Sequence, residues 1–399
     1  MRNHQPRRPH PLERLGTLHR LGAFCALLAV ALSPGLASSQ DTGGDEELPE
    51  RARAIHERVL TLDTHIDIDT DNFTIERNYS MELPTQATLG KMEEGGLDVG
   101  WFVVYTRQGP LDADGYAAAY ANAIDKFEAI HRLAADFAPE RIEVALTADE
   151  ARRIAAAGRL VAMIGVENAY PLGEEIGRIE EFHGMGARYM SLAHNGHNQL
   201  SDSHTGEEEG DWMHGGLSEM GRLAIAEMNR LGIIVDISHP SRESIMQTLE
   251  LSRAPVIASH SSVRALADVS RNLDDEMLHA VAANGGVVHA VPVRSFVDRT
   301  KAEEVVDVAD FVDHIDYMVE LIGIEHVGIS SDFDGGGGVN GWDDASETFN
   351  VTLELVRRGY TEEEIAMLWS DNLLRVLEEV QAVAAQIQEE DRLAAHHAQ

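Results

Sequence analysis

The sequence predicts an α/β protein, a (βα)8 barrel of the TIM type with a C-terminal helical extension. Short, largely apolar runs alternate with amphipathic stretches from Arg51 onward, a pattern typical of parallel strands joined by helical crossovers. Eight such runs occur in a chain of 399 residues, which favours a closed barrel over an open doubly wound sheet. The predicted strands are Leu62–Ile68, Leu97–Tyr105, Leu160–Glu167, Ala187–His194, Ile233–His239, Ala254–His260, Gly286–Val291 and His326–Asp332.

Helices are predicted between the strands because apolar residues recur there with the spacing of one helix face. The segment Thr361–Ile387 has a similar pattern, and we expect it to close the base or the side of the barrel. Residues 388–399 are predicted to be a frayed tail. The clearest intervening helices are Ala117–Leu133, Ser218–Leu231, Ser241–Leu251 and Phe311–Leu321.

Residues 1–39 are predicted to be a secretory signal peptide. An arginine-rich region precedes the apolar core Leu21–Leu32, and small residues follow as a cleavage site. An uncleaved anchor is the alternative, but the core is shorter than the roughly 20 residues that a spanning helix needs. We therefore expect cleavage and a secreted or periplasmic protein without stable membrane insertion. Residues 40–50 are predicted to be a linker, and residues 51–387 the barrel domain.

The composition restricts the class of partner. The chain has 68 acidic and 32 basic residues, and its formal net charge is −36. Such a surface repels nucleic acid and anionic membranes, so neither is expected as a partner. Only three lysines occur, a pattern that salt adaptation and GC-rich coding explain equally well. The single cysteine, Cys25, would leave with the signal, so no disulfide is expected.

The first predicted strand ends in the most informative motif, His65-Ile66-Asp67. Side chains two residues apart on a strand point the same way, so an imidazole and a carboxylate would project together. This pair of ligand types suits a borderline metal such as zinc. A His-x-Asp can also be an ordinary hydrogen-bonded pair, so the motif needs support from other strand ends.

Other strand ends give that support. Glu167, His194, His239, His260 and Asp332 each lie at or next to the carboxyl end of a predicted strand. In a barrel these ends converge on one mouth, where active sites of this fold lie. The sequence therefore predicts a metal site there.

The ligand supply indicates two ions. The strand ends offer more histidines and carboxylates than one tetrahedral zinc needs, and a shared carboxylate can hold two metals that activate one water for hydrolysis. Many metal-dependent barrels use a carboxylated lysine as the bridge. No lysine lies between Lys126 and Lys301, which covers the third to the sixth strand, so an ordinary carboxylate is expected and Glu167 is the candidate.

In combination, these motifs resemble the membrane (renal-type) dipeptidases of the amidohydrolase superfamily. The resemblance extends from about Leu60 to Leu377 and implies a binuclear zinc barrel that hydrolyses dipeptides. The cysteines and the lipid-anchor tail of animal members are absent, which points to a bacterial secreted member. The motifs are Asp63–Asp67, the strand that ends in Glu167, Ser191–His194, Asp236–His239, Ala258–Ser262, Ser331–Gly335, His214–Leu217, Glu227–Gly232 and Asn372–Val376.

The resemblance implies a ligand set for two zinc ions per chain. His65 and Asp67 would bind the first ion, His239 and His260 the second, and Glu167 would bridge both.

The resemblance also implies the groups that act on the substrate. His194 matches a substrate-binding histidine with a catalytic role, and Asp332 matches the acid/base that passes a proton to the leaving amine. Arg271 matches the arginine that takes the C-terminal carboxylate, a role that suits the fork of a guanidinium. The implied reaction is hydrolysis of dipeptides with a free C-terminal carboxylate by a hydroxide that bridges two metals.

Several alternatives stay open from the sequence. The same metal centre could serve a lactonase, a phosphotriesterase or a deaminase, although Arg271 argues for a carboxylated substrate. A catalytically inactive binding protein is the alternative from another class. The segment His197–Trp212 would overhang the mouth and leaves the substrate preference open, as does the oligomeric state, for which a homodimer is one option.

Other polar residues are discounted. His197, His204 and His214 are predicted to be solvated loop histidines, and His289 a core or mouth-lining residue. Asp334 is predicted to bond to the backbone or to support a ligand.

Overall fold

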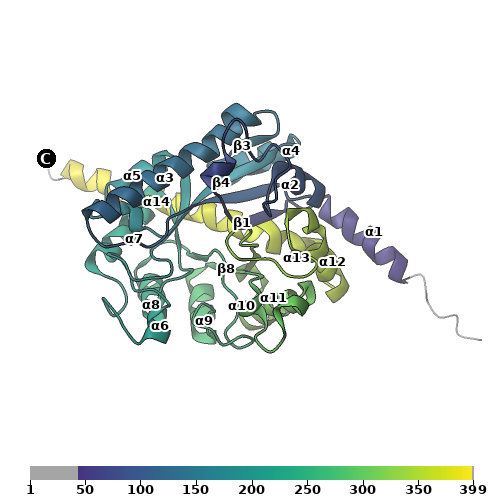
Figure 1. Cartoon of the computed structure of the whole chain (residues 1–399). Coiled ribbons are helices and arrows are strands. Elements are labelled where there is room, and N and C mark those ends of the chain that lie inside the picture. The colour runs from purple at the N-terminus through teal and green to yellow at the C-terminus, as the bar shows by residue number, and fades with distance from the viewer. Residues whose placement is uncertain (1–43, 398–399) are drawn as a thin grey trace, which may run out of the picture. The chain divides into compact units, whose positions relative to one another are not determined.

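The computed structural model describes residues 44–397; the predicted signal peptide lies outside the described residues. Within that range, parallel strands form one sheet in the order β1-β2-β4-β5-β6-β7-β8-β9, and β3 pairs only with β4. The helices surround these strands (Figure 1). The strands are β1 Leu62–Asp67, β2 Val99–Tyr105, β3 Ile142–Val144, β4 Leu160–Glu167, β5 Ala187–Ser191, β6 Ile234–Asp236, β7 Ile257–Ala258, β8 Val287–Ala290 and β9 Val327–Ile329.

The sheet closes on itself between its first and last strands. The backbone N–H of Asp67 donates to the carbonyl of Phe333 at 2.9 Å, and the hydroxyl of Thr64 donates to the carbonyl of Ile329 at 2.8 Å. A parallel bridge between Ile66 and Phe333 continues the pairing beyond β9. The predicted (βα)8 barrel is therefore confirmed.

All eight predicted strands are present, but most of them end earlier than predicted. The polar residues at their carboxyl ends, such as His194, His239 and Asp332, leave the ladder and turn into the mouth. The sequence did not predict β3, because three residues that pair with the beginning of β4 are too short a run to show an alternating pattern.

The four predicted helices correspond to α3, α7, α8 and α11, with ends shifted by a few residues. Short 3-10 segments include η1, Thr70–Asn72, and a π-helical turn, η7, covers Met367–Asp371. The α-helices are α1 Gly44–His56, α2 Leu89–Gly95, α3 Ala113–Arg132, α4 Ala148–Ala156, α5 Arg178–Gly184, α6 Gly206–Glu209, α7 Glu219–Leu231, α8 Arg242–Leu251, α9 Asp275–Asn284, α10 Arg294–Val297, α11 Val308–Ile322, α12 Phe349–Arg358, α13 Glu362–Ala366 and α14 Asn372–His397.

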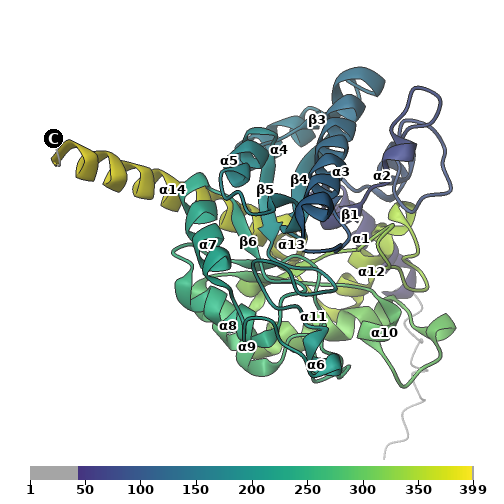
Figure 2. The same ribbon diagram turned by 60° about the vertical axis from the view of Figure 1, so that its left-hand side comes forward.

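Two predictions about the chain ends need correction. Residues 44–50, assigned to the linker, begin α1, which continues to His56 and packs on α12 through buried Ala52 and Ile55. The tail does not fray at residue 388, because α14 continues to His397 and projects from the barrel (Figure 2). Its last turns are exposed, and ion pairs such as Arg392–Glu389 support the helix.

The barrel has two apolar layers, as expected for strands whose side chains alternate between the interior and the surrounding helices. The interior cluster includes Val99, Trp101 and Met163, whereas Phe102 and Ile164 belong to the outer layer with the helices. The interior cluster also contains the first turns of α14. This helix therefore closes the base of the barrel and leaves the carboxyl ends of the strands as the open end. The α14 members of the interior cluster are Leu373, Leu374, Val376, Leu377 and Val380.

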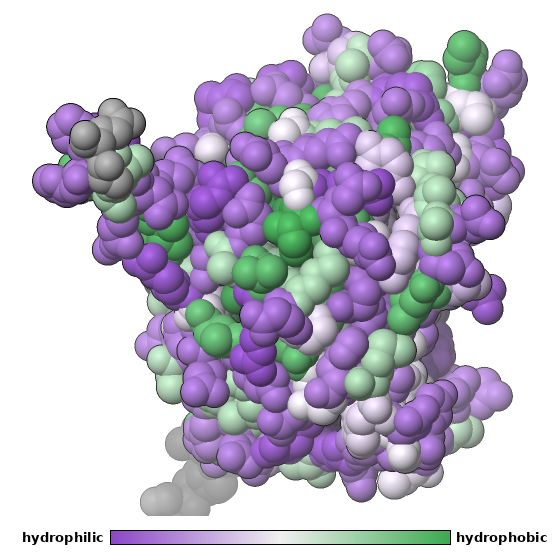
Figure 3. Space-filling view, turned by 90° about the vertical axis from the view of Figure 1, so that its left-hand side faces the viewer, coloured by the Kyte–Doolittle hydropathy of each residue, from purple (hydrophilic) through white to green (hydrophobic). Residues whose placement is uncertain are grey.

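Among residues 44–397, no helix combines the length and the apolar character needed to span a bilayer. One face of the molecule is largely hydrophilic, with a few hydrophobic residues near its middle (Figure 3). This surface agrees with the acidic composition of the chain.

Candidate metal centre and substrate pocket

A cavity of about 730 Å³ opens at the carboxyl ends of the strands. Seven of the eight predicted site residues line it, and the eighth, His65, is fully buried behind them. Those that line the cavity are Asp67, Glu167, His194, His239, His260, Arg271 and Asp332. Residues from six different strand ends therefore meet in one place, as the sequence predicts for a barrel mouth.

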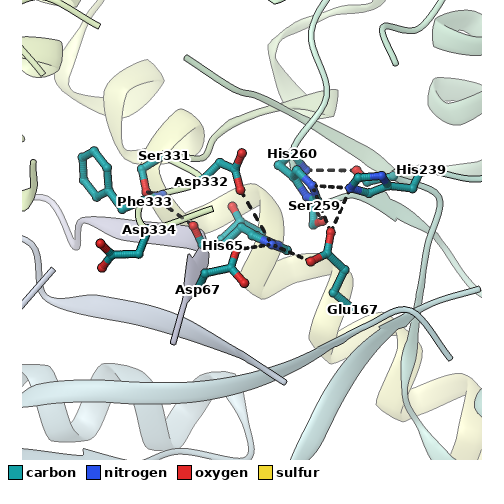
Figure 4. A network of polar contacts seen from close by, with 12 residues as sticks. His65, Asp67, Glu167, His239, Ser259, His260, Ser331, Asp332, Phe333 and Asp334 are labelled. Atoms are coloured by element: carbon teal, nitrogen blue, oxygen red, sulfur yellow. Dashed lines mark hydrogen bonds and ion pairs between the residues drawn. The ribbon is translucent and has the colours of Figure 1, made fainter. Parts of the chain in front are cut away.

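Glu167, the last residue of β4, lies between two groups of potential ligands (Figure 4). Its Oε1 is 2.8 Å from Nε2 of His239 and 3.4 Å from Nε2 of His260. Its Oε2 is 3.6 Å from Nε2 of His65, which in turn lies 3.5 Å from Oδ2 of Asp67. Each carboxylate oxygen of Glu167 thus faces a different group, the arrangement that a bridging carboxylate requires.

Hydrogen bonds at the far nitrogen of two histidines fix which nitrogen faces the centre. The hydroxyl of Tyr189 donates to the carbonyl of Thr64 at 3.1 Å and lies 3.0 Å from Nδ1 of His65. The hydroxyl of Ser259 donates to Asp236 at 2.6 Å and lies 2.7 Å from Nδ1 of His260. Each hydroxyl proton is already used, so each Nδ1–H must donate, and Nε2 is left with a free lone pair.

His239 follows the same rule through a different partner. Its Nδ1 lies 3.0 Å from Oδ1 of Asn195, an acceptor, so its Nε2 also presents a lone pair. This Nε2 is 3.0 Å from Nε2 of His260, and Nε2 of His65 is buried without a hydrogen-bond partner. Lone pairs that converge in this way repel one another unless a cation lies between them. The donor set therefore fits metal ions, and imidazole and carboxylate ligands suit zinc.

A glycine makes room for two carboxylates. A Cβ atom at Gly335 would lie 2.3 Å from Oδ2 of Asp67 and 2.4 Å from Oδ1 of Asp332. Burial, with the nearby carboxylates of Asp67 and Glu167, raises the pKa of Asp332 well above its ordinary value. A carboxyl group with a raised pKa can hold and release a proton, which suits an acid/base.

The backbone at the mouth is held in an uncommon conformation. Among the described residues, four non-glycine residues have positive φ: Asn168 (70°), His239 (80°), Asp332 (57°) and Asp334 (60°). All four follow strands β4, β6 or β9. Positive φ costs of order 1 kcal/mol or more outside glycine, and it persists where the surrounding structure imposes it, often at functional sites.

His194 lies at the edge of the metal centre. Its Nε2 is 3.8 Å from Oε1 of Glu167, and its ring lies 4.1 Å from the ring of His239 and 4.7 Å from that of Tyr105. Burial lowers the pKa of His194, so the ring can donate one N–H while it remains neutral. This position is compatible with contact to a substrate oxygen, and His194 also lies close enough to Glu167 and His239 to share a metal.

Arg271 is buried in the wall of the cavity. Its Nη1 donates to the hydroxyl of Ser261 at 2.9 Å and its Nη2 to the carbonyl of His260 at 3.0 Å. Nε has no partner among the described residues. Burial lowers the pKa of Arg271 to about 10, so it remains a cation at neutral pH. A buried cation without a carboxylate partner suits an anionic ligand group.

Of the three loop histidines that the sequence analysis discounted, one lines the cavity and two do not. His204 lines the cavity, contrary to the prediction of a solvated loop residue, and its Nε2 lies 2.8 Å from Oδ1 of Asn195. His197 and His214 instead organise the overhanging loop, by contacts to Asp202 and to the carbonyl of Asn198. His204 shows that the segment 197–212 does border the mouth.

The other two discounted residues agree with the prediction. His289 is a core residue whose Nδ1 lies 2.9 Å from the carbonyl of Ala258. Asp334 accepts a hydrogen bond from the backbone N–H of Gln86 at 2.9 Å and also lines the cavity.

The sequence interpretation assigned no role to several further wall residues, of which two are polar groups close to the proposed site. Lys126 of α3 and Asn195 after β5 line the cavity. The type of residue gives no signal for Asn195, whereas the scarcity of lysine in the chain could have drawn attention to Lys126.

Comparison with known proteins identifies the family of this chain. The model of the membrane dipeptidase family (peptidase family M19) matches residues 49–391. The chain is 33% identical to dipeptidase aclJ of Aspergillus oryzae over 307 residues. This alignment covers 76% of this chain and 72% of that protein. The alternatives outside the dipeptidases therefore lose support.

Two solved structures show the same fold. The probable dipeptidase PvdM of Pseudomonas aeruginosa aligns with a TM-score of 0.80 and 29% identity, over 85% of this chain and 100% of that chain. A metallo peptidase of Rhodobacter sphaeroides, liganded with a phosphinate mimic of the dipeptide L-Ala-D-Ala, aligns with a TM-score of 0.71 and 25% identity, over 81% of this chain and 99% of that chain. This chain belongs to the membrane dipeptidase family, peptidase family M19, and is a hydrolase of the metallo-dipeptidase type.

Proposed function

We propose that this protein is a zinc-dependent dipeptidase that hydrolyses dipeptides with a free C-terminal carboxylate. The observation that supports this most directly is the position of Glu167, whose two oxygens face His239 and His260 on one side and His65 on the other. In this proposal, His65 and Asp67 hold one ion, His239 and His260 the other, and Glu167 bridges the two. When bound there, the ions would make a water molecule more acidic at neutral pH and would polarise the scissile carbonyl.

The substrate would lie between Arg271 and the metal ligands. The guanidinium of Arg271 would form charge-assisted hydrogen bonds to the α-carboxylate of the second residue. His194 would donate to the scissile carbonyl oxygen and stabilise the negative charge that develops there. Both groups are buried and held by neighbours, so little reorganisation is needed during the reaction.

Asp332 would move the proton. Burial, together with the neighbouring carboxylates of Asp67 and Glu167, raises the pKa of Asp332, and this favours proton uptake from the attacking nucleophile. It would then donate that proton to the amine of the departing residue. This sequence of steps keeps the leaving group neutral and frees the second amino acid with its carboxylate on Arg271.

Arg271 favours this reaction over the other hydrolytic ones. A buried guanidinium in the cavity wall requires an anionic partner. The free carboxylate of a dipeptide supplies that partner, whereas lactones and phosphotriesters need not carry one. The presence of all five proposed metal ligands and of Asp332 also argues against an inactive binding protein.

Localisation and assembly stay predictions. The signal peptide 1–39, its cleavage, the resulting secreted or periplasmic location, a bacterial source and a homodimer are not tested by the described residues.

A dipeptide library assayed with zinc-loaded protein tests the proposal. L-L and L-D pairs should be hydrolysed at measurable rates, and chelation should abolish the activity. Matched tripeptides and dipeptide amides serve as controls and should be poor substrates. Equal turnover of dipeptides and dipeptide amides would contradict the proposed role of the free carboxylate.

A further inference from the structure

Lys126 is a buried lysine in the wall of the substrate cavity. It lies on α3, its exposed fraction is 8%, and it lines the cavity with the metal-site residues. The other two lysines of the chain differ, because Lys91 pairs with Asp344 and Lys301 with Asp310. A lysine so deeply buried normally has an ion-pair partner.

The ammonium group of Lys126 has no such partner within the described part of the chain. No acidic oxygen lies within 4.0 Å of it and no hydrogen bond satisfies it; its Nζ instead lies 5.3 Å from the centre of the Tyr105 ring. The carboxylate of Asp69, on the same wall, accepts from the backbone N–H of Asp71 and so caps η1. Burial lowers the pKa of Lys126, the expected result for a cation that is partly removed from water.

Lys126 and Arg271 lie on opposite sides of the cavity. Helix α3 packs against β2 and η1, and Arg271 follows β7. In the barrel order β1-β2-β4-β5-β6-β7-β8-β9, strands β2 and β7 are four places apart, which is half of the circumference. A substrate held by Arg271 at one end therefore extends over the metal ligands toward Lys126.

We propose that Lys126 binds a carboxylate on the side chain of the first residue, so that the enzyme prefers dipeptides with an N-terminal aspartate or glutamate. This inference rests on the proposed function, in which Arg271 holds the C-terminal carboxylate. The ring of Tyr105 lies next to Lys126, and Tyr105 and Asn72 add neutral hydrogen-bonding groups to the same cavity wall. Asp67 and Asp69 line the same region and disfavour a doubly charged group such as phosphate, so a single carboxylate fits best.

Matched dipeptides test the inference. Wild type should hydrolyse Glu-Ala with a kcat/KM about 10- to 100-fold above that for the isosteric Gln-Ala, the usual effect of one buried charge-assisted hydrogen bond. Lys126→Met should reduce this ratio to near one, and Lys126→Arg should keep part of it. Lys301→Met, a change at a surface ion pair, is the control and should leave the ratio as in wild type.

A second pair of substrates tests which end of the dipeptide Lys126 recognises. The ratio of Ala-Glu to Ala-Gln should be the same in wild type and Lys126→Met. Inhibition constants of phosphinate mimics of Glu-Ala and Gln-Ala measure binding apart from turnover and should show the same loss of preference.

The outcomes separate the two proposals. If neutral dipeptides such as Ala-Ala are hydrolysed but Glu-Ala is not preferred, or if Lys126→Met keeps the preference, the inference about Lys126 is overturned and the dipeptidase proposal stands. A change in the Ala-Glu to Ala-Gln ratio would place Lys126 at the other residue and would also overturn it. If no dipeptide is hydrolysed, the proposed function fails and this inference fails with it.

Discussion

The hydroxyl of Ser259 connects His260 to Asp236: it accepts from Nδ1 of His260 at 2.7 Å and donates to Oδ2 of Asp236 at 2.6 Å. Asp236 is fully buried, and the backbone N–H groups of Ser238 and Ser259 also donate to it. The relay holds the His260 ring in one orientation and one tautomer. Such outer contacts orient the ligands, and their loss typically lowers metal affinity by about 10- to 100-fold.

Ser259→Ala should therefore weaken metal binding without the loss of a ligand. We expect the Kd of the weaker ion to rise about 10-fold or more, the usual effect of an outer-contact mutation. Competition with a chromophoric chelator measures the change. Ser370→Ala removes another buried hydroxyl, one without a hydrogen-bond partner among the described residues, and is the matched control with unchanged affinity.

Glu167→Gln should lose at least one metal ion per chain. A neutral amide bridges two cations poorly, and its NH2 group cannot act as a ligand. Elemental analysis of the purified variant, compared with two ions in wild type, tests this. Glu354→Gln changes a buried carboxylate that pairs with Arg357 and Arg358, away from the cavity, and should keep both ions. Two tightly held ions in Glu167→Gln would exclude Glu167 as the bridge.

Asp332→Asn should keep its metals and lose turnover. Loss of a general acid/base lowers kcat by roughly two orders of magnitude or more. Metal content and steady-state kinetics on one dipeptide give both quantities. Asp334→Asn is the neighbouring control, because Asp334 accepts a hydrogen bond from the backbone N–H of Gln86. This variant should lose much less turnover than Asp332→Asn. Wild-type turnover in Asp332→Asn would show that another group carries the proton.

Arg271→Ala should lower kcat/KM strongly for free dipeptides and hardly at all for dipeptide amides. Loss of one charge-assisted pair in a partly dry cavity costs about 2–4 kcal/mol, or roughly 30- to 1000-fold in kcat/KM. Kinetics on each dipeptide and its amide measure the difference. Arg253→Ala, which breaks a surface pair with Glu390, should leave both rates unchanged. An equal loss on both substrates would indicate a structural role for Arg271.

Acid should destabilise the fold through His289. Burial lowers the pKa of His289 to about 4 from the ordinary 6.5, so between these values the unfolded chain binds a proton that the folded chain does not. The free energy of unfolding should therefore fall as pH decreases from 6.5 to 4, by about 3 kcal/mol for this residue. Chemical denaturation at pH 7 and pH 4.5 should show a smaller loss in His289→Asn than in wild type. The metal centre is the same in both proteins, so its own pH dependence affects both equally. Equal losses of unfolding free energy in the two proteins would therefore show that His289 is not responsible.

The barrel and most of the site could be predicted from the sequence because both depend on local patterns. Strand and helix periodicities are properties of neighbouring residues, and a polar residue that ends an apolar run marks a strand end whatever the rest of the chain does. Parallel strands in a barrel then bring those ends together by topology alone. His65, Glu167 and Asp332 are remote in sequence, yet their meeting at one mouth follows from this rule.

Local patterns also set the limits of the prediction. An acidic stretch gave no sign that residues 44–50 begin α1, because burial against α12 is a tertiary contact. The polar end of α14 is helical although its last turns are exposed. The helix is already nucleated at the barrel base, and side-chain pairs such as Arg392–Glu389 support its continuation.

The sequence by itself determined the fold class, the strand ends and the ligand types, because these are encoded in residue order. The tertiary structure alone decided which nitrogen each histidine presents and which helix face meets the cavity. The tautomer of His260 depends on Ser259 and Asp236, which adjacent strands bring together. The placement of Lys126 in the cavity wall depends on how α3 rotates as it packs on β2, and the order of residues within one helix does not specify that rotation.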